Sequence, residues 1–342
     1  MLSGEALQPG LETLLVCPVC RGELPLSEVS ESRAWRCSRC GCRYETGTHA
    51  AILIPEVLPH RAVRRKWNAW VQLQENGLVY YEADPEHNLS VGERADVEAF
   101  ATFCKPAGLV LDIGCGPQSL PSYWKPVGEA ELIGIDPLSG EEERAFGFVQ
   151  GIGEYLPFRS DTFDQVLMAS SLDHALAPRR VLREARRVLK GDGRLSLWFF
   201  DVDTTKRTFA QRCRDHRRRI ARRLRKLGRV PGILMRGGPS ALLVKVRRRL
   251  AIATANGATG ATPHPADPAE TLTVPSGAAD AFHIEYCTTS RVFRWLSQTG
   301  YSIRRVRVFE RSHVFVEAVP ASRPVLGFLK RAESRRGEHR GA

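Results

Sequence analysis

Leu-Val-Leu-Asp-Ile-Gly-Cys-Gly-Pro, residues 109–117, is the stretch of sequence that decides the fold. Its first three residues are apolar and have the character of a buried parallel strand. Asp112 ends the apolar run, and Gly114, Cys115 and Gly116 follow in a segment typical of a tight turn. In a doubly wound sheet, a nucleotide-like ligand lies at such a corner. A glycine pair after a strand is a weak signal by itself, because ordinary turns share it.

The segments that follow strengthen this interpretation. A second predicted strand, residues 131–135, ends in Asp136, a carboxylate that can accept both hydroxyls of a ribose. A third strand, residues 165–168, leads to Ser170. Next comes a helix with apolar side chains on one face: Val181, Leu182, Ala185, Val188 and Leu189. We expect residues 191–193 to end this helix and residues 194–200 to form a further strand. The alternation of strands and helices predicts an α/β fold.

In this order the segments resemble the class I S-adenosylmethionine-dependent methyltransferases, specifically the broad group called methyltransferase type 11. The resemblance covers residues 100–201 and resumes at residue 283. It implies a Rossmann-like, doubly wound, seven-stranded sheet and S-adenosyl-L-methionine as the cofactor. The cofactor-binding residues that it implies are Asp112, Gly114, Cys115, Gly116, Asp136, Gly153, Glu154 and Ser170.

Two positions depart from the pattern of these methyltransferases. Gln118 stands where a third glycine is often found. Ile152 stands where many members place an aspartate against the adenine amino group. A backbone carbonyl or the Glu154 carboxylate would have to accept that hydrogen bond, so weak cofactor binding is one expectation to test.

Two pairs of cysteines near the N-terminus have the spacing of a zinc ribbon. Cys17 with Cys20 and Cys37 with Cys40 form two Cys-x-x-Cys pairs, with 16 residues between them. Four thiolates fill the tetrahedral coordination of Zn²⁺, so the predicted site is structural. Disulfides, which a reducing compartment disfavours, and free thiols are the alternatives. Cys42 is a rival to Cys40 as the fourth ligand.

The N-terminal segment also carries two resemblances. Residues 15–18 and 44–55 resemble the corresponding segments of the small zinc-ribbon activator proteins, which bind and stabilise methyltransferases. A ribbon before a methyltransferase domain also resembles the bacterial 23S ribosomal RNA guanine methyltransferases. Those usually include a histidine among their zinc ligands, whereas all four candidates here are cysteines.

The net charge of +12 is concentrated in one insertion. From Lys206 to Arg249 there are 17 Lys or Arg residues and one acid, Asp215. Apolar residues between Phe209 and Leu227 fall on one narrow stripe, as in a basic amphipathic helix. Such a helix could cover the active site as a cap, lie on an anionic membrane surface or bind RNA. The sequence leaves these three interpretations open.

The chain has no run of about 18 apolar residues, so we expect no membrane-spanning helix. Its first residues lack the pattern of a signal peptide. The cytoplasm is the expected compartment, with peripheral attachment to a membrane as an alternative.

We expect six segments along the chain. They are a zinc-ribbon module (1–57), a helical connector (58–103), the S-adenosylmethionine-binding core (104–201), a basic helical insertion with a flexible linker (202–281), the C-terminal part of the core (282–320) and a basic tail (321–342). In the connector, Trp67 and Trp70 are interpreted as residues that pack a helix, with a role as walls of the site as the alternative.

Methyl transfer from a sulfonium is an in-line displacement, and a general base is needed only when the acceptor must lose a proton. His174 and His283 are the candidate bases, although His174 also fits a structural histidine at the start of a helix. Three functions remain. The chain is a methyltransferase for a small-molecule or lipid-linked acceptor, a ribosomal or transfer RNA methyltransferase, or a non-catalytic cofactor-binding partner protein.

Overall fold

The computed structural model describes residues 10–29, 32–47, 50–56, 58–83, 94–138, 143–201, 284–310 and 312–321. Contacts along the chain separate residues 1–202 with 269–342, the first unit, from residues 203–268, which lie wholly outside the described residues. Every described residue belongs to the first unit. The basic insertion from Lys206 to Arg249, the candidate base His283 and the C-terminal tail lie outside the described residues.

Strands β5 to β11 are seven of the eleven strands in one mixed sheet. In spatial order these are β7 (Gly147–Gln150), β6 (Ala130–Asp136), β5 (Gly108–Ile113), β8 (Phe163–Ala169), β9 (Leu189–Phe200), β11 (His313–Pro320) and β10 (Tyr301–Phe309). The strands from β7 to β9 run parallel, and β11 and β10 are antiparallel to their neighbours. The strand order reverses beside β5, which is where a doubly wound sheet binds its ligand.

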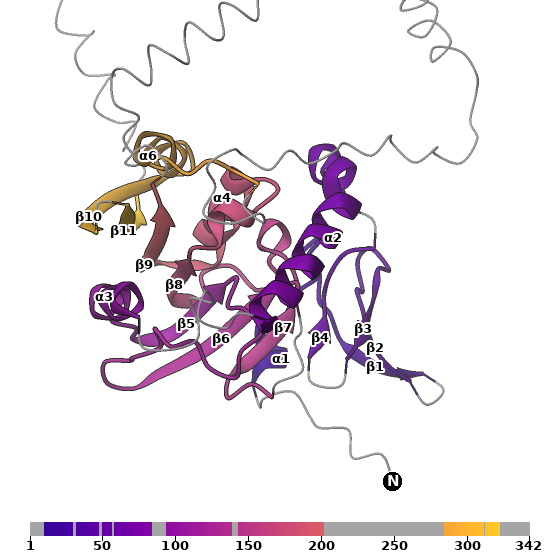
Figure 1. Cartoon of the computed structure of the whole chain (residues 1–342). Helices are drawn as coiled ribbons and strands as arrows, with labels where there is room; N and C mark the ends of the chain where they lie inside the picture. Colours follow the sequence, from indigo (N-terminus) through magenta and orange to yellow (C-terminus); the bar gives the residue numbers. More distant parts are fainter. Residues whose placement is uncertain are drawn as a thin grey trace, which may run out of the picture. The chain divides into compact units, whose positions relative to one another are not determined.

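Four N-terminal strands extend this sheet. They are β1 (Leu26–Val29), β2 (Ser32–Arg36), β3 (Arg43–Thr46) and β4 (Ala51–Ile52), each antiparallel to the next. Strand β4 pairs in parallel with β7, with Ala51 opposite Val149 (Figure 1). The described sheet therefore has 11 strands instead of the expected seven, because the cysteine-bearing segment joins its edge.

The helices follow from local sequence signals. They are α1 (Leu11–Leu14), α2 (Arg61–Ala83), α3 (Ala95–Cys104), α4 (Pro178–Val188) and α6 (Thr289–Gln298), with short 3₁₀ turns η2 (Gly153–Tyr155) and η3 (Leu172–His174). Helix α4 begins with Pro178, whose missing N–H costs nothing at that position. In α6, the Thr288 hydroxyl caps the helix by accepting the Arg291 N–H at 3.2 Å.

One predicted boundary is wrong. Leu189 was expected on the buried face of the helix and residues 191–193 were expected to end it. The structure ends α4 at Val188 and begins β9 at Leu189, which pairs with Phe163 of β8. The side chain of Leu189 is fully buried in either arrangement, so its apolar character could not distinguish them.

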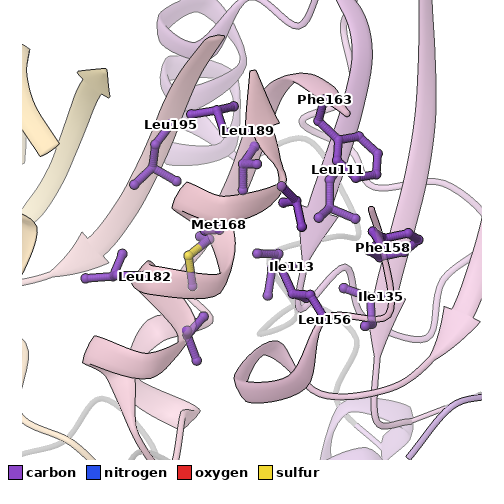
Figure 2. Packing of buried hydrophobic residues seen from close by; sticks show 14 of the residues in the cluster. Leu111, Ile113, Ile135, Leu156, Phe158, Phe163, Met168, Leu182, Leu189 and Leu195 are labelled. Atoms are coloured by element: carbon purple, nitrogen blue, oxygen red, sulfur yellow. The ribbon is translucent and has the colours of Figure 1, made fainter. Parts of the chain in front are cut away.

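A continuous apolar core fills the space between one face of the sheet and α4. Figure 2 shows part of it, with Leu111 and Ile113 of β5, Ile135 of β6, Met168 of β8 and Leu182 of α4. The same cluster includes N-terminal residues, among them Leu15, Trp35 and Tyr44. The N-terminal strands therefore share a core with the rest of the sheet. Phe100, Tyr123, Trp198 and Phe315 belong to a second cluster.

Candidate functional site

A cavity of about 910 Å³, including space open to solvent, lies at the carboxyl ends of β5, β6 and β8. Six of the eight predicted cofactor residues line it, together with one predicted base: Gly114, Gly116, Asp136, Gly153, Glu154, Ser170 and His174. Asp112 and Cys115 do not line it. The structure thus brings most of the predicted site together from four separate segments of the chain.

The turn after β5 requires its two glycines. Gly114 and Gly116 have φ values of +78° and +79°, in the left-handed region. A Cβ on Gly114 would lie 2.4 Å from the Ser171 Cβ, and one on Gly116 would lie 2.4 Å from the Gln118 Oε1. The Ser171 hydroxyl in turn donates to the Ile113 carbonyl at 2.6 Å. The packing of Ser171 and Gln118 against the turn therefore requires glycine at both positions.

Asp136 holds the turn and faces the cavity. Its Oδ2 accepts the Gly116 N–H and its Oδ1 accepts the Leu138 N–H, both at 2.9 Å. Burial raises the pKa of this carboxyl, and the two N–H donors and the Arg144 charge partly offset that rise. A carboxylate oxygen has room for more than one hydrogen bond, so this side chain can also accept a hydroxyl from a ligand.

Asp112 and Cys115 lie behind the turn. The Asp112 carboxylate is fully buried and accepts the Tyr123 hydroxyl at 2.6 Å. Burial raises its pKa to about 7, although the Tyr123 hydrogen bond lowers it. Cys115 is fully buried, and burial raises the pKa of its thiol well above the usual value. The structure therefore gives these two predicted cofactor residues a supporting position instead of a place in the cavity wall.

Glu154 anchors the wall opposite Asp136 to helix α4. Its Oε1 accepts the Ala177 N–H at 2.9 Å, just before the helix begins. The Arg180 Nε donates to the Glu154 carbonyl at 2.8 Å. Burial raises the pKa of the carboxyl, and the backbone donors partly offset the rise. Because this carboxylate already holds the helix end, its sequence-based role as an adenine partner stays a prediction.

Ser170 and His174 form the edge of the cavity beyond β8. Ser170 has a φ of +54°, unusual for a residue with a side chain, and its N–H donates to the Trp198 carbonyl at 2.9 Å. His174 lies at the end of η3, is half-buried and is one of the residues that line the cavity. The predicted base is thus at the cavity, whereas its rival His283 lies outside the described residues.

Helix α2 contributes two cavity residues: Trp70, for which a place in the wall was the alternative interpretation, and Gln74, which the sequence did not single out. The Trp70 indole N–H donates to the His174 carbonyl at 2.7 Å, and its ring stacks on Trp67 at 5.2 Å between centroids. Gln74, one helical turn later, is buried and lines the cavity. The four-residue spacing of Trp70 and Gln74 was the available signal, because it places both on one helix face. Trp70 both packs the helix and forms a wall.

The four predicted cysteine ligands form one cluster. The sulfur atoms of Cys17, Cys20, Cys37 and Cys40 all lie within 4.8 Å of one another. The Cys17–Cys40 and Cys20–Cys37 sulfur distances are 3.6 and 3.3 Å. Sulfur atoms around a tetrahedral Zn²⁺ lie about 3.8 Å apart, so the donor set fits that ion. Cys42 lies outside this group, and its carbonyl accepts the Cys37 N–H at 2.9 Å.

None of the helices in the described part of the chain has the length and apolarity that crossing a bilayer requires.

Residues 111–197 match the family model described as a methyltransferase domain. An uncharacterized methyltransferase of Bacillus subtilis is 34% identical over 105 residues, which are 28% of this chain and 41% of that protein. An uncharacterized protein of Methanocaldococcus jannaschii is 31% identical over 117 residues, which are 32% of this chain and 53% of that protein. The chain therefore spans about half the length of these curated relatives or less.

Two similar solved structures have low identity. One is a Burkholderia thailandensis 1,6-didemethyltoxoflavin-N1-methyltransferase with bound 1,6-didemethyltoxoflavin and S-adenosylhomocysteine, at 11% identity and a TM-score of 0.43, covering 83% of this chain and 98% of that one. Another is a complex between a Haloferax volcanii methyltransferase activator and a methyltransferase, at 12% identity and a TM-score of 0.39, covering 76% and 98%. The family match is the finding that assigns the domain. Residues 111–197 therefore match a methyltransferase domain.

Proposed function

We propose that this chain transfers a methyl group from S-adenosylmethionine to a small-molecule or lipid-linked acceptor. The observation that carries the proposal is the cavity, which is lined mostly by residues of the matched segment, including the glycine turn and Asp136, and in addition by Trp70 and Gln74 of α2. Its other walls include Ile113, Met168 and Trp70. A largely apolar cavity with a few convergent polar groups is typical of a site for a small organic molecule.

The residues present fit this cofactor. The Asp136 carboxylate can accept ribose hydroxyls, since the residue lines the cavity and each of its oxygens now accepts only one N–H. Gly114 and Gly116 line the cavity together with Ile152 and Gly153. When bound, the cofactor supplies an electrophilic methyl group on a sulfonium.

The protein's part in the reaction is alignment and exclusion of water. The apolar walls and the buried ring of Trp70 would keep water from the reacting atoms. His174 lines the same cavity and could accept a proton from an acceptor that must lose one. An acceptor that is already nucleophilic would need no base.

The cysteine cluster has a structural role in the same proposal. We infer that Cys17, Cys20, Cys37 and Cys40 hold one Zn²⁺ ion, because four sulfur donors converge within 4.8 Å. Strand β4 then connects this cluster to β7, so the metal would stabilise the edge of the sheet. The cytoplasmic location, and contacts of residues 206–249 with membrane or RNA, stay predictions because nothing in the described residues tests them.

Radiolabelled S-adenosylmethionine, added with the purified chain to a fractionated cell extract, tests the proposed reaction. Label in a small-molecule or lipid fraction, lost with Asp136→Ala, is the expected result. Label in RNA would replace the proposed acceptor class with RNA. Absence of label from every fraction, while the cofactor is shown to bind, would contradict the enzymatic function and favour a non-catalytic partner protein.

A further inference from the structure

Gln74 has an unusual environment on helix α2 (Figure 1). The residue is only 9% exposed, and its Nε2 atom is buried. Among the described residues, no acceptor lies within hydrogen-bond distance of that nitrogen. The side chain lines the cavity that the methyltransferase domain forms. Because a buried amide N–H without an acceptor is destabilising, this position of a polar side chain needs an explanation.

The helix is fixed at this place by its neighbours. Trp70 lies four residues before Gln74, on the same helix face, and its indole N–H binds the His174 carbonyl at 2.7 Å. The Trp70 ring belongs to an apolar cluster with Ile152 and Tyr155. These contacts fix the face of α2 that carries Gln74 beside the cavity, and a simple rotation of α2 that would expose this residue to solvent would break them.

The sequence of the same helix offers a comparison. Gln72, two residues earlier, is exposed and so has water as its partner. The two glutamines have identical side chains and the same helical backbone, and they differ in the face on which they lie. The difference in burial therefore reflects the helix face, and Gln74 lies on the face that lines the cavity, with a side-chain N–H that has no partner in the described part of the chain.

We propose that Gln74 recognises the molecule bound in the cavity by donating its side-chain N–H to an oxygen or nitrogen acceptor atom of that molecule. This inference rests on the proposed function and adds a recognition residue from the connector, outside the segment that matches the family. Two molecules could supply the acceptor atom: the cofactor, through its ribose, adenine or carboxylate, or the methyl acceptor.

The test compares Gln74→Leu with the matched control Gln72→Leu. Two readouts are used: calorimetric affinity for S-adenosylhomocysteine, and the rate of label transfer from radiolabelled S-adenosylmethionine into the cell extract. We expect Gln74→Leu to lower at least one readout about tenfold, and Gln72→Leu to change neither. A lower affinity assigns the cofactor as the partner, and slower transfer at unchanged affinity assigns the methyl acceptor.

A thermal midpoint separates recognition from a structural role. Leucine fills a similar volume and removes the unpartnered amide, so Gln74→Leu should unfold at the wild-type temperature or above it. Gln74→Glu is the second variant, because it keeps the length and polarity of the side chain but removes the amide N–H donor. It should show the same fall in affinity or in transfer rate as Gln74→Leu. Wild-type affinity and transfer in both Gln74 variants would overturn the proposal. Failure of the wild-type chain itself to bind S-adenosylhomocysteine would instead reject the proposed function.

Discussion

The cysteine cluster and the cavity are both assembled from distant segments, but their polar atoms are arranged differently. In the cluster, four sulfur atoms face one another within 4.8 Å, and a single ion can satisfy them all. In the cavity, Asp136 and Gln74 face a space of about 910 Å³, solvent included, bounded by apolar walls. The first arrangement is typical of a closed structural site and the second of a site that binds an exchangeable molecule.

The largest effect should come from breaking the cluster. Replacing Cys17 and Cys37 by Ser should remove about one zinc per chain and destabilise the fold by more than about 4 kcal/mol, since metal binding contributes directly to folding. The thermal midpoint should fall by about 10 °C or more. Metal analysis and thermal unfolding measure both. Cys42→Ser is the control and should keep the metal; metal-free wild-type protein would refute the structural zinc site.

The next largest effect should come from the glycine turn. Gly114→Ala adds a Cβ 2.4 Å from Ser171 at a φ of +78°, so we expect a loss of about 3 kcal/mol in unfolding free energy. Gly128 has a similar φ of +72° but open space around it, and Gly128→Ala should cost only about 1 kcal/mol. Urea unfolding compares the two. Equal losses would show that crowding at the turn is unimportant.

Asp136 and Asp112, the aspartates beside the glycine turn, should respond differently to replacement by asparagine. Asp136 lines the cavity and Asp112 does not. Asp136→Asn should weaken the binding of S-adenosylhomocysteine about tenfold, or about 1.4 kcal/mol, because a charged acceptor is lost. Asp112→Asn should change the affinity less than about twofold. Calorimetry measures both. The reverse order of effects would mean that the cofactor lies on the other side of the turn.

The smallest effect concerns pH. The pKa of Asp112 is about 7 in the folded chain and about 3.9 in an unfolded one, so the fold favours the protonated carboxyl. The contribution of Asp112 to the stability of the fold is fully present below about pH 4 and is lost as the pH rises to about 7. The unfolding free energy of the wild-type chain, relative to that of Asp112→Asn, should therefore fall by about 1 to 2 kcal/mol between pH 5 and pH 7.

Urea unfolding of the wild-type chain and Asp112→Asn at both pH values measures this difference. A difference that stays constant with pH would mean that Asp112 is ionised in the fold throughout this range.

The parts of the fold that local sequence dictates were predictable. The apolar run and glycines of residues 109–117 identify β5 and its turn, and they place the cavity at the correct corner. Alternation along a strand could have improved the prediction further. Adjacent strand residues point to opposite faces, so Ile113 and Asp112 cannot both face the cavity. Ile113 does so, whereas Asp112 contacts Tyr123.

Features set by long-range pairing were not predictable. Strand β4 has only two residues, and its parallel pairing with β7 joins segments about a hundred positions apart. The start of β9 at Leu189 depends on its pairing with Phe163. The position of Gln74 depends on which face of α2 meets the domain. No local pattern carries this information, because each depends on a neighbour distant in sequence.

The measurement that tests the central claim most directly is photo-crosslinking of radiolabelled S-adenosylmethionine to the chain, followed by mapping of the labelled peptides. We predict saturable label on peptides that contain the cavity walls, from residues 113–117, 136–138 and 151–154. Excess S-adenosylhomocysteine should prevent the labelling of these peptides. Saturable label confined to other parts of the chain, or label that S-adenosylhomocysteine does not displace, would contradict the assignment of this cavity as the cofactor site.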